Sequence, residues 1–199
     1  LAGVPEHAVK RAADEAQKRQ LEGWALTLDY PTYDAVMTHA DNRELRRELY
    51  RAWSTRASDQ GETDEWDNSS NIEKILALRH EAAKLVGFDN YADYSLATKM
   101  AASTDQVISF LRELASRARA AAERELAELR HKAGTGIEPW DVAYWLEKLK
   151  QDKYSISNEV LRQYFPQKKV TAGLFSLAER LYNVKLAEKI DVEAWHDTV

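Results

Sequence analysis

The longest apolar pattern in the sequence, between Ser103 and Gly134, constrains the fold most strongly. Its apolar residues recur every three or four positions, which is the period of one face of an α-helix. Ser103 and Gln106 predict a capping box at its start, and Gly134 and Gly136 predict its end. The stripe consists of Val107, Leu111, Leu114, Ala118, Ala122, Leu126 and Leu129. A helix of ~30 residues spans about 45 Å, so we expect it to lie along the full height of a sizeable body.

Composition extends this helical prediction to the rest of the chain. Only 7 Gly and 4 Pro occur among 199 residues, and this scarcity favours long helices over a many-stranded sheet. The chain is 44% hydrophobic and 31% charged, which is ordinary for a globular protein. We therefore predict a mainly α fold, a multi-helix array that is not a bundle and that contains at most one short strand or hairpin.

The first sixty residues predict three helices and one strand. The first helix begins near Pro5, and a second covers 33–40 after a break at Tyr30-Pro31. Asp41 and Glu44 are spaced as a capping box for the third helix. The strand is predicted from the alternation of Trp24, Leu26 and Leu28.

The remaining sequence predicts further helices within a single helical segment, 1–199. The loop is clearest near 59–66, and a hinge is expected near 134–140. One helix runs from about Asn68 to Gly87, and a short one follows Asn90. The last three helices begin near Glu138, Ser157 and Lys169, and the final one carries a stripe predicted to be buried: Val170, Leu174, Leu177, Ala178 and Leu181.

Charge and cysteine content bear on partners and location. The formal net charge is −5, so a broad cationic field for nucleic acid or anionic membrane is not expected. The chain has 0 Cys, which fits a reducing compartment, and we expect a cytoplasmic protein. No apolar run approaches the ~20 residues that cross a bilayer. Leu1-Ala2-Gly3 is neither a signal peptide nor an initiator Met, so both ends are expected to be cut sites in a longer chain.

The string from His80 to Lys84 comes closest to a metal motif. A zinc peptidase helix carries H-E-x-x-H because residues i and i+4 share a face and bind one metal. Here the second position is Lys84, a cation that repels zinc, so Glu81 has no bound water to activate. An exposed polar face, with Glu81 and Lys84 near one another, is favoured instead. The other histidines are scattered through the sequence: His7, His39, His131 and His196. We predict no metal ligand and no catalytic residue in this chain.

Two other clusters admit a functional interpretation beside a structural one. Five arginines that could suggest phosphate binding are interleaved with Glu44 and Glu48, which favours a solvated, ion-paired face. These are Arg43, Arg46, Arg47, Arg51 and Arg56. Aromatic residues at helical spacing are usually core, and contact with a peptide substrate is left open. They form two groups: Trp140, Tyr144 and Trp145, and Tyr91 with Tyr94.

Several short strings follow one another in a recognisable order along the chain. They are Leu26-Thr27-Leu28-Asp29-Tyr30-Pro31, Ser54-Thr55-Arg56-Ala57-Ser58-Asp59, the run from Leu78 to Tyr91, Leu96-Ala97-Thr98-Lys99-Met100-Ala101, Pro139-Trp140-Asp141, Tyr154, Tyr164-Phe165-Pro166, Gly173-Leu174-Phe175 and Trp195-His196. In this order they resemble the thimet oligopeptidase and oligopeptidase A family, over essentially the whole sequence, and the first two strings are especially similar to bacterial oligopeptidase A. One local departure is Tyr144-Trp145, where the family commonly has two tyrosines.

The resemblance implies a larger zinc metallopeptidase that cuts short peptides in a deep channel between two mainly helical halves. The family's H-E-F-G-H helix, its third ligand and its transition-state Tyr and His lie downstream of the region that is similar here. No catalytic residue can therefore be carried over to this chain. Zinc is expected in the intact enzyme and not on this chain, whose partners would be short unstructured peptides and the remaining catalytic half.

We therefore predict a segment that contributes channel wall and scaffold but is inactive by itself. One alternative is a free-standing helical module that binds peptides or a partner without catalysis. A second alternative is an enzyme with an unrecognised site assembled by folding.

Overall fold

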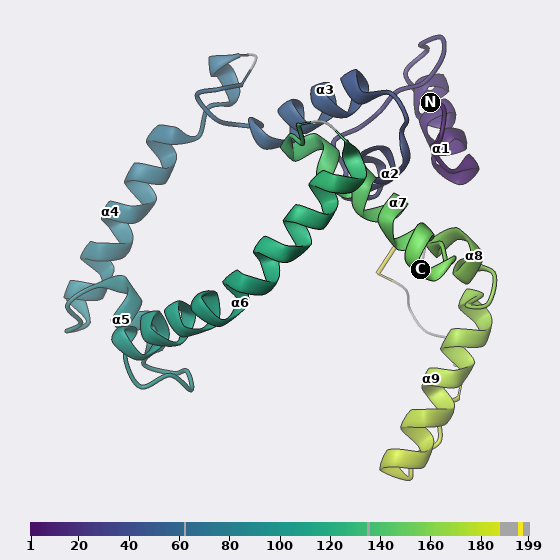
Figure 1. The fold of residues 1–199 in the computed structure, drawn as a ribbon. Helices are drawn as coiled ribbons and strands as arrows, with labels where there is room; N and C mark the ends of the chain where they lie inside the picture. The colour runs from purple at the N-terminus through teal and green to yellow at the C-terminus, as the bar shows by residue number, and fades with distance from the viewer. Residues whose placement is uncertain (62, 135, 188–194, 197–199) are drawn as a thin grey trace. The chain divides into compact units, whose positions relative to one another are not determined.

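The computed structural model describes residues 1–61, 63–134, 136–187 and 195–196 (Figure 1). All regular structure in these ranges is helical, which confirms the mainly α prediction. The α-helices are α1 Glu6–Lys18, α2 Tyr30–His39, α3 Arg43–Ser54, α4 Ser69–Leu85, α5 Tyr91–Leu96, α6 Thr104–Ala133, α7 Val142–Tyr154, α8 Asn158–Arg162 and α9 Gln167–Tyr182, and the 3-10 helices are η1 Asp64–Trp66 and η2 Pro139–Asp141. None of the helices in these ranges is both long and apolar enough to traverse a lipid bilayer.

The chain divides into two compact units, Leu1–Lys153 and Tyr154–Val199. Unit 1 contains α1 through almost all of α7, and unit 2 contains α8 and α9. The prediction of one helical segment over 1–199, with a loop near 59–66 and a hinge near 134–140, stays a prediction.

Helix α6 has the caps that the sequence predicts. The Ser103 hydroxyl accepts a hydrogen bond from the Gln106 N–H at 3.2 Å, and Gly134 ends the helix with a φ of 69°. That left-handed conformation favours glycine because it has no Cβ. The Gln106 side chain accepts from the N–H of Ala102, one residue before the predicted partner, at 2.7 Å.

The start of α2 and the cap of α3 differ from the prediction. Asp29 caps α2 by accepting from the Thr32 N–H at 3.1 Å, so Tyr30-Pro31 opens this helix rather than breaking the chain. Proline fits there because backbone N–H groups in the first turn of a helix have no hydrogen-bond acceptor within the helix, so the N–H that proline lacks is not needed. Asn42, not Asp41, caps α3, and its side-chain oxygen accepts a hydrogen bond from the Leu45 N–H at 3.1 Å.

The predicted strand at 24–28 is wrong, and only two of its three alternating apolar residues point inward. Leu26 and Leu28 pack on the core, whereas Trp24 is 57% exposed. No strand in the described residues pairs with this segment. Its backbone is satisfied differently, because the Ala25 N–H donates to Ala12 O and the Arg56 guanidinium donates to Leu28 O, both at 3.0 Å.

The core of unit 1 lies between α2 and α3. Val36, Ala40 and Leu49 are buried there, and half-buried apolar residues pack around them. The N-terminal segment passes close to the end of α2, where a Cβ added to Gly3 would come within 2.2 Å of His39 O. This close approach, together with a φ of +83°, requires glycine at that position.

The stripe predicted to be buried on α9 is largely exposed, and so is the apolar stripe of α6. On α6, Leu111 and Leu114 are 54% and 53% exposed, while Leu129 is buried. On α9, Leu174 and Leu181 are 60% and 67% exposed. A periodic pattern shows which face of a helix is apolar, but burial also needs a packing partner. The described part of each unit supplies little cover for these faces.

Candidate functional site

A buried ion pair joins α3 to η2 across the sequence. The Arg46 Nη2 donates to Asp141 Oδ1 at 2.8 Å, and the two side chains are only 3% and 2% exposed. Arg43 adds a second guanidinium, with its Nη2 donating to Asp141 Oδ2 at 2.6 Å and its Nε 3.0 Å from both carboxylate oxygens. We call Arg43, Arg46 and Asp141 the ionic cluster.

The ionic cluster keeps Asp141 ionised despite its burial. Burial alone raises the pKa of this carboxyl group, but hydrogen bonds from Arg43 and Arg46 and from the Glu138 N–H lower it. The net effect is a pKa below the ordinary Asp value, because charged donors favour the carboxylate form. The Asp141 carboxylate is therefore ionised at neutral pH and accepts hydrogen bonds from two guanidinium groups.

Arg46 also binds the end of α2 and the backbone of η2. Its Nη1 donates to Ala40 O at 2.6 Å and its Nε donates to Trp140 O at 3.1 Å. Its guanidinium carbon lies 4.2 Å from the centre of the Tyr144 ring, and the Tyr144 hydroxyl donates to Asp41 at 3.0 Å. Burial first, and then this hydrogen bond, raise the pKa of Tyr144. One arginine thus holds three elements together.

The prediction of a solvated arginine face is wrong for Arg46 and correct for Arg47. Arg47 pairs with Glu44 on the surface, as the interleaved charges predict. Arg46 instead shares the inner face of α3 with Leu49, three residues later. The position of Arg46 on the apolar face of α3 could have indicated a buried ion pair, because a buried charge requires a partner.

The first aromatic group lies beside the ionic cluster, where the Tyr144 ring faces the Arg46 guanidinium. The Trp140 ring contacts Tyr50 edge-on at 6.0 Å, and Tyr144 contacts Trp145 at 5.3 Å. All four are half-buried. The other predicted group behaves differently, because Tyr91 and Tyr94 are 38% and 42% exposed beside Phe88.

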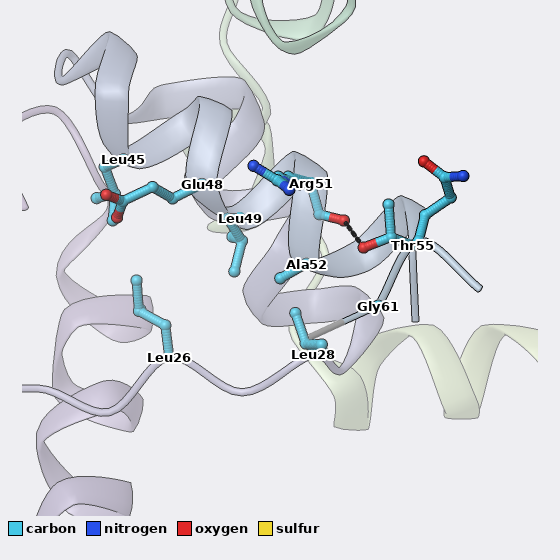
Figure 2. Close-up of a pocket in the computed structure, with 10 residues that line it drawn as sticks. Leu26, Leu28, Leu45, Glu48, Leu49, Arg51, Ala52, Thr55 and Gly61 are labelled. Carbon is cyan, nitrogen blue, oxygen red and sulfur yellow. Dashed lines mark hydrogen bonds between the residues drawn. The ribbon is translucent and has the colours of Figure 1, made fainter. Parts of the chain in front are cut away.

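An open groove of about 660 Å³ lies between α3 and the extended segment before α2 (Figure 2). Figure 2 shows Leu26 and Leu28 directed toward Leu49 and Ala52 of α3. The lining is completed by Leu45, Glu48, Arg51, Thr55, Gln60 and Gly61. The Thr55 hydroxyl already donates to Arg51 O at 2.8 Å. The apolar floor of the groove suits an aliphatic side chain. Glu48 is the one carboxylate in this lining, so the groove is better suited to binding than to catalysis.

The residues suggested by the metal-like string do not fit zinc. His80, Glu81 and Lys84 are exposed on α4, and the Lys84 amino group lies 3.1 Å from Asp89. This places a surface ion pair where a second ligand would be needed, with Asp89 as the partner of Lys84 rather than Glu81. Within the described ranges, no three His, Cys, Asp or Glu side chains converge as a zinc site requires. The remaining histidines belong to different elements or to loops: His7, His39, His131 and His196.

Comparisons with known proteins agree with the family resemblance. Peptidase family M3 matches residues 36–199. The chain is 54% identical to oligopeptidase A of Salmonella typhimurium and to that of Escherichia coli, and 46% identical to that of Haemophilus influenzae. Each alignment covers 100% of this chain and 30% of the relative, so the chain spans less than a third of these proteins' length. The chain therefore belongs to Peptidase family M3.

Proposed function

We propose that this chain is a helical part of a zinc-dependent oligopeptidase and forms channel wall and scaffold outside the catalytic centre. The observation that carries the proposal is the alignment with oligopeptidase A, which covers 100% of this chain but only 30% of the relative. The dispersed histidines support the same division of labour, because zinc ligation needs several donors in one place. Hydrolysis would then belong to other residues of the protein.

The substrates of the whole protein would be short, unstructured peptides, and its metal would be zinc. This chain would exclude folded proteins from the channel and would hold neighbouring parts of the same protein in position. The ionic cluster supports the scaffold role, since its buried and half-buried hydrogen bonds join α3 to η2 and to the end of α2. The absence of cysteine in the sequence supports a reducing, cytoplasmic location.

The groove favours a second candidate function, that of a helical module that binds peptides without catalysis. Leu26, Leu28 and Leu49 offer an apolar floor, and Glu48 and Arg51 line the same groove. Such a module would bind an aliphatic peptide as the isolated chain. The wall proposal predicts weak or undetectable peptide binding by the isolated chain, because a channel needs both of its sides.

The wall proposal is tested in a full-length protein that carries this sequence. Residues 67–134 are replaced by a short Gly-Ser linker, which leaves the groove and the ionic cluster in place. We expect zinc content and cleavage of a short peptide to persist, while cleavage extends to longer peptides and unfolded proteins because the wall is incomplete. Glu113→Gln, which removes an exposed pair with Arg117, is the control. An unchanged size limit in the linker variant would refute the wall role.

A further inference from the structure

Helices α4, α5 and α6 lie in sequence between α3 and η2, two elements of unit 1 that contact each other. We call Ser69–Ala133 the arm. The chain enters it after α3 and leaves it before η2, and α3 and η2 contact each other. The ionic cluster lies at this contact, because Arg43 and Arg46 belong to α3 and Asp141 belongs to η2. The elements that flank the arm in sequence, α3 and η2, are therefore joined by charge.

The arm itself is held mainly by its own helices. Among the described residues, α5 contacts both α4 and α6, and Ala83 and Leu129 are the buried residues of α4 and α6. Helices with so few buried apolar contacts open at low free energy. Two ion pairs tie the last turns of α6 to α7, Lys132 with Asp152 and Glu128 with Lys153, and all four side chains are at least 34% exposed. Exposed pairs of this kind contribute little to stability.

The attachments at the base therefore differ greatly in strength. The Arg46–Asp141 pair is almost fully desolvated and each partner has further hydrogen bonds to backbone groups. Removing one partner from such a pair leaves an uncompensated charge inside the protein, which is costly. Arg43 is 54% exposed and binds the same carboxylate from the solvent side.

We propose that the Arg46–Asp141 pair is a latch that keeps the base of the arm closed, so that the arm opens and closes as one unit on an intact base. Arg43 reinforces the latch from outside. The latch divides unit 1 into a stable part, α2–α3 with η2–α7, and an arm with its own opening equilibrium. This device goes beyond the wall role, because it would hold whether or not the arm borders a channel.

Hydrogen exchange followed by mass spectrometry tests the latch in the 199-residue chain. In the wild type, amides of α4, α5 and the first two-thirds of α6 are expected to exchange at least about 10-fold faster than those of α2 and α3. In Asp141→Asn, exchange in α3 and α7 should rise by about 10-fold or more, while rates in the arm change by less than about 3-fold. Asp152→Asn, which removes the exposed pair with Lys132, is the matched control and should change neither region.

A milder variant keeps the test decisive if Asp141→Asn does not fold. Arg43→Gln leaves Arg46 and Asp141 paired and should raise exchange in α3 and η2 by about 3-fold, again without an effect on the arm. Two results would overturn the latch. One is a rise in arm exchange that matches the rise in α3, which would mean a single cooperative unit. The other is unchanged exchange in α3 in both cluster variants.

Discussion

Replacing Asp141 by Asn should lower the free energy of unfolding of unit 1 by about 3–5 kcal/mol. The amide keeps the shape of the carboxylate but leaves the Arg46 guanidinium, which is 3% exposed, without a counter-charge. Arg43 can reach solvent at lower cost, so most of the effect comes from Arg46. The measurement is urea unfolding followed by circular dichroism at neutral pH.

The control for this substitution is Glu113→Gln, which removes an exposed pair with Arg117 on α6. That change should cost less than about 1 kcal/mol, because exposed pairs are screened by water and salt. Equal losses in the two variants would show that burial of the ionic cluster does not matter to stability.

The same variant has a characteristic dependence on pH. The Asp141 carboxylate has a pKa below its ordinary value of 3.8 because the hydrogen bonds of Arg43 and Arg46 outweigh the effect of burial. Its contribution to stability is therefore fully present above the ordinary value and is lost as the pH falls through the lowered one. Wild-type stability should fall in that acid range, and the difference between wild type and Asp141→Asn should shrink there. A constant difference down to acid pH would contradict this pairing.

Replacing Leu49 by Ala should cost about 2–5 kcal/mol, because it removes a buried side chain and leaves a cavity. Leu49 is 7% exposed and forms the core cluster with Val36 and Ala40. Leu49 also lines the groove of Figure 2, so the substitution would deepen this groove. Urea unfolding again supplies the measurement.

Leu76→Ala is the matched control, since Leu76 is a leucine of the same chain that is 60% exposed on α4. We expect it to change stability by roughly 0.5 kcal/mol or less. If the isolated chain instead lost as much stability from Leu76→Ala as from Leu49→Ala, the core would not lie between α2 and α3 as described.

Local chemistry explains which parts of the fold could be predicted from sequence. The bounds of α6 follow from Ser103 and Gly134, because a cap acts within a few residues of itself. The strand at 24–28 was predicted from alternation alone. A strand also needs a partner, and the segment packs its leucines on α3 without one.

The ionic cluster was harder to predict than the helices. Arg46 and Asp141 lie far apart in sequence, and neither periodicity nor a motif relates them. Placing Arg46 on the apolar face of α3 would have shown that it needs a buried anion, but not which one. The groove depends on how two segments pack, so its lining could not be read from spacing. The resemblance to a peptidase family depended on residue identity and was confirmed by the family match.

Zinc content is the most direct test of a division between this chain and the catalytic centre. The purified 199-residue chain would be incubated with zinc, freed of excess metal by gel filtration, and analysed by inductively coupled plasma mass spectrometry. We expect far less than one zinc per chain, and no chelator-sensitive cleavage of a short peptide. One tightly held zinc per chain, lost when a histidine of this chain is replaced, would contradict the proposal.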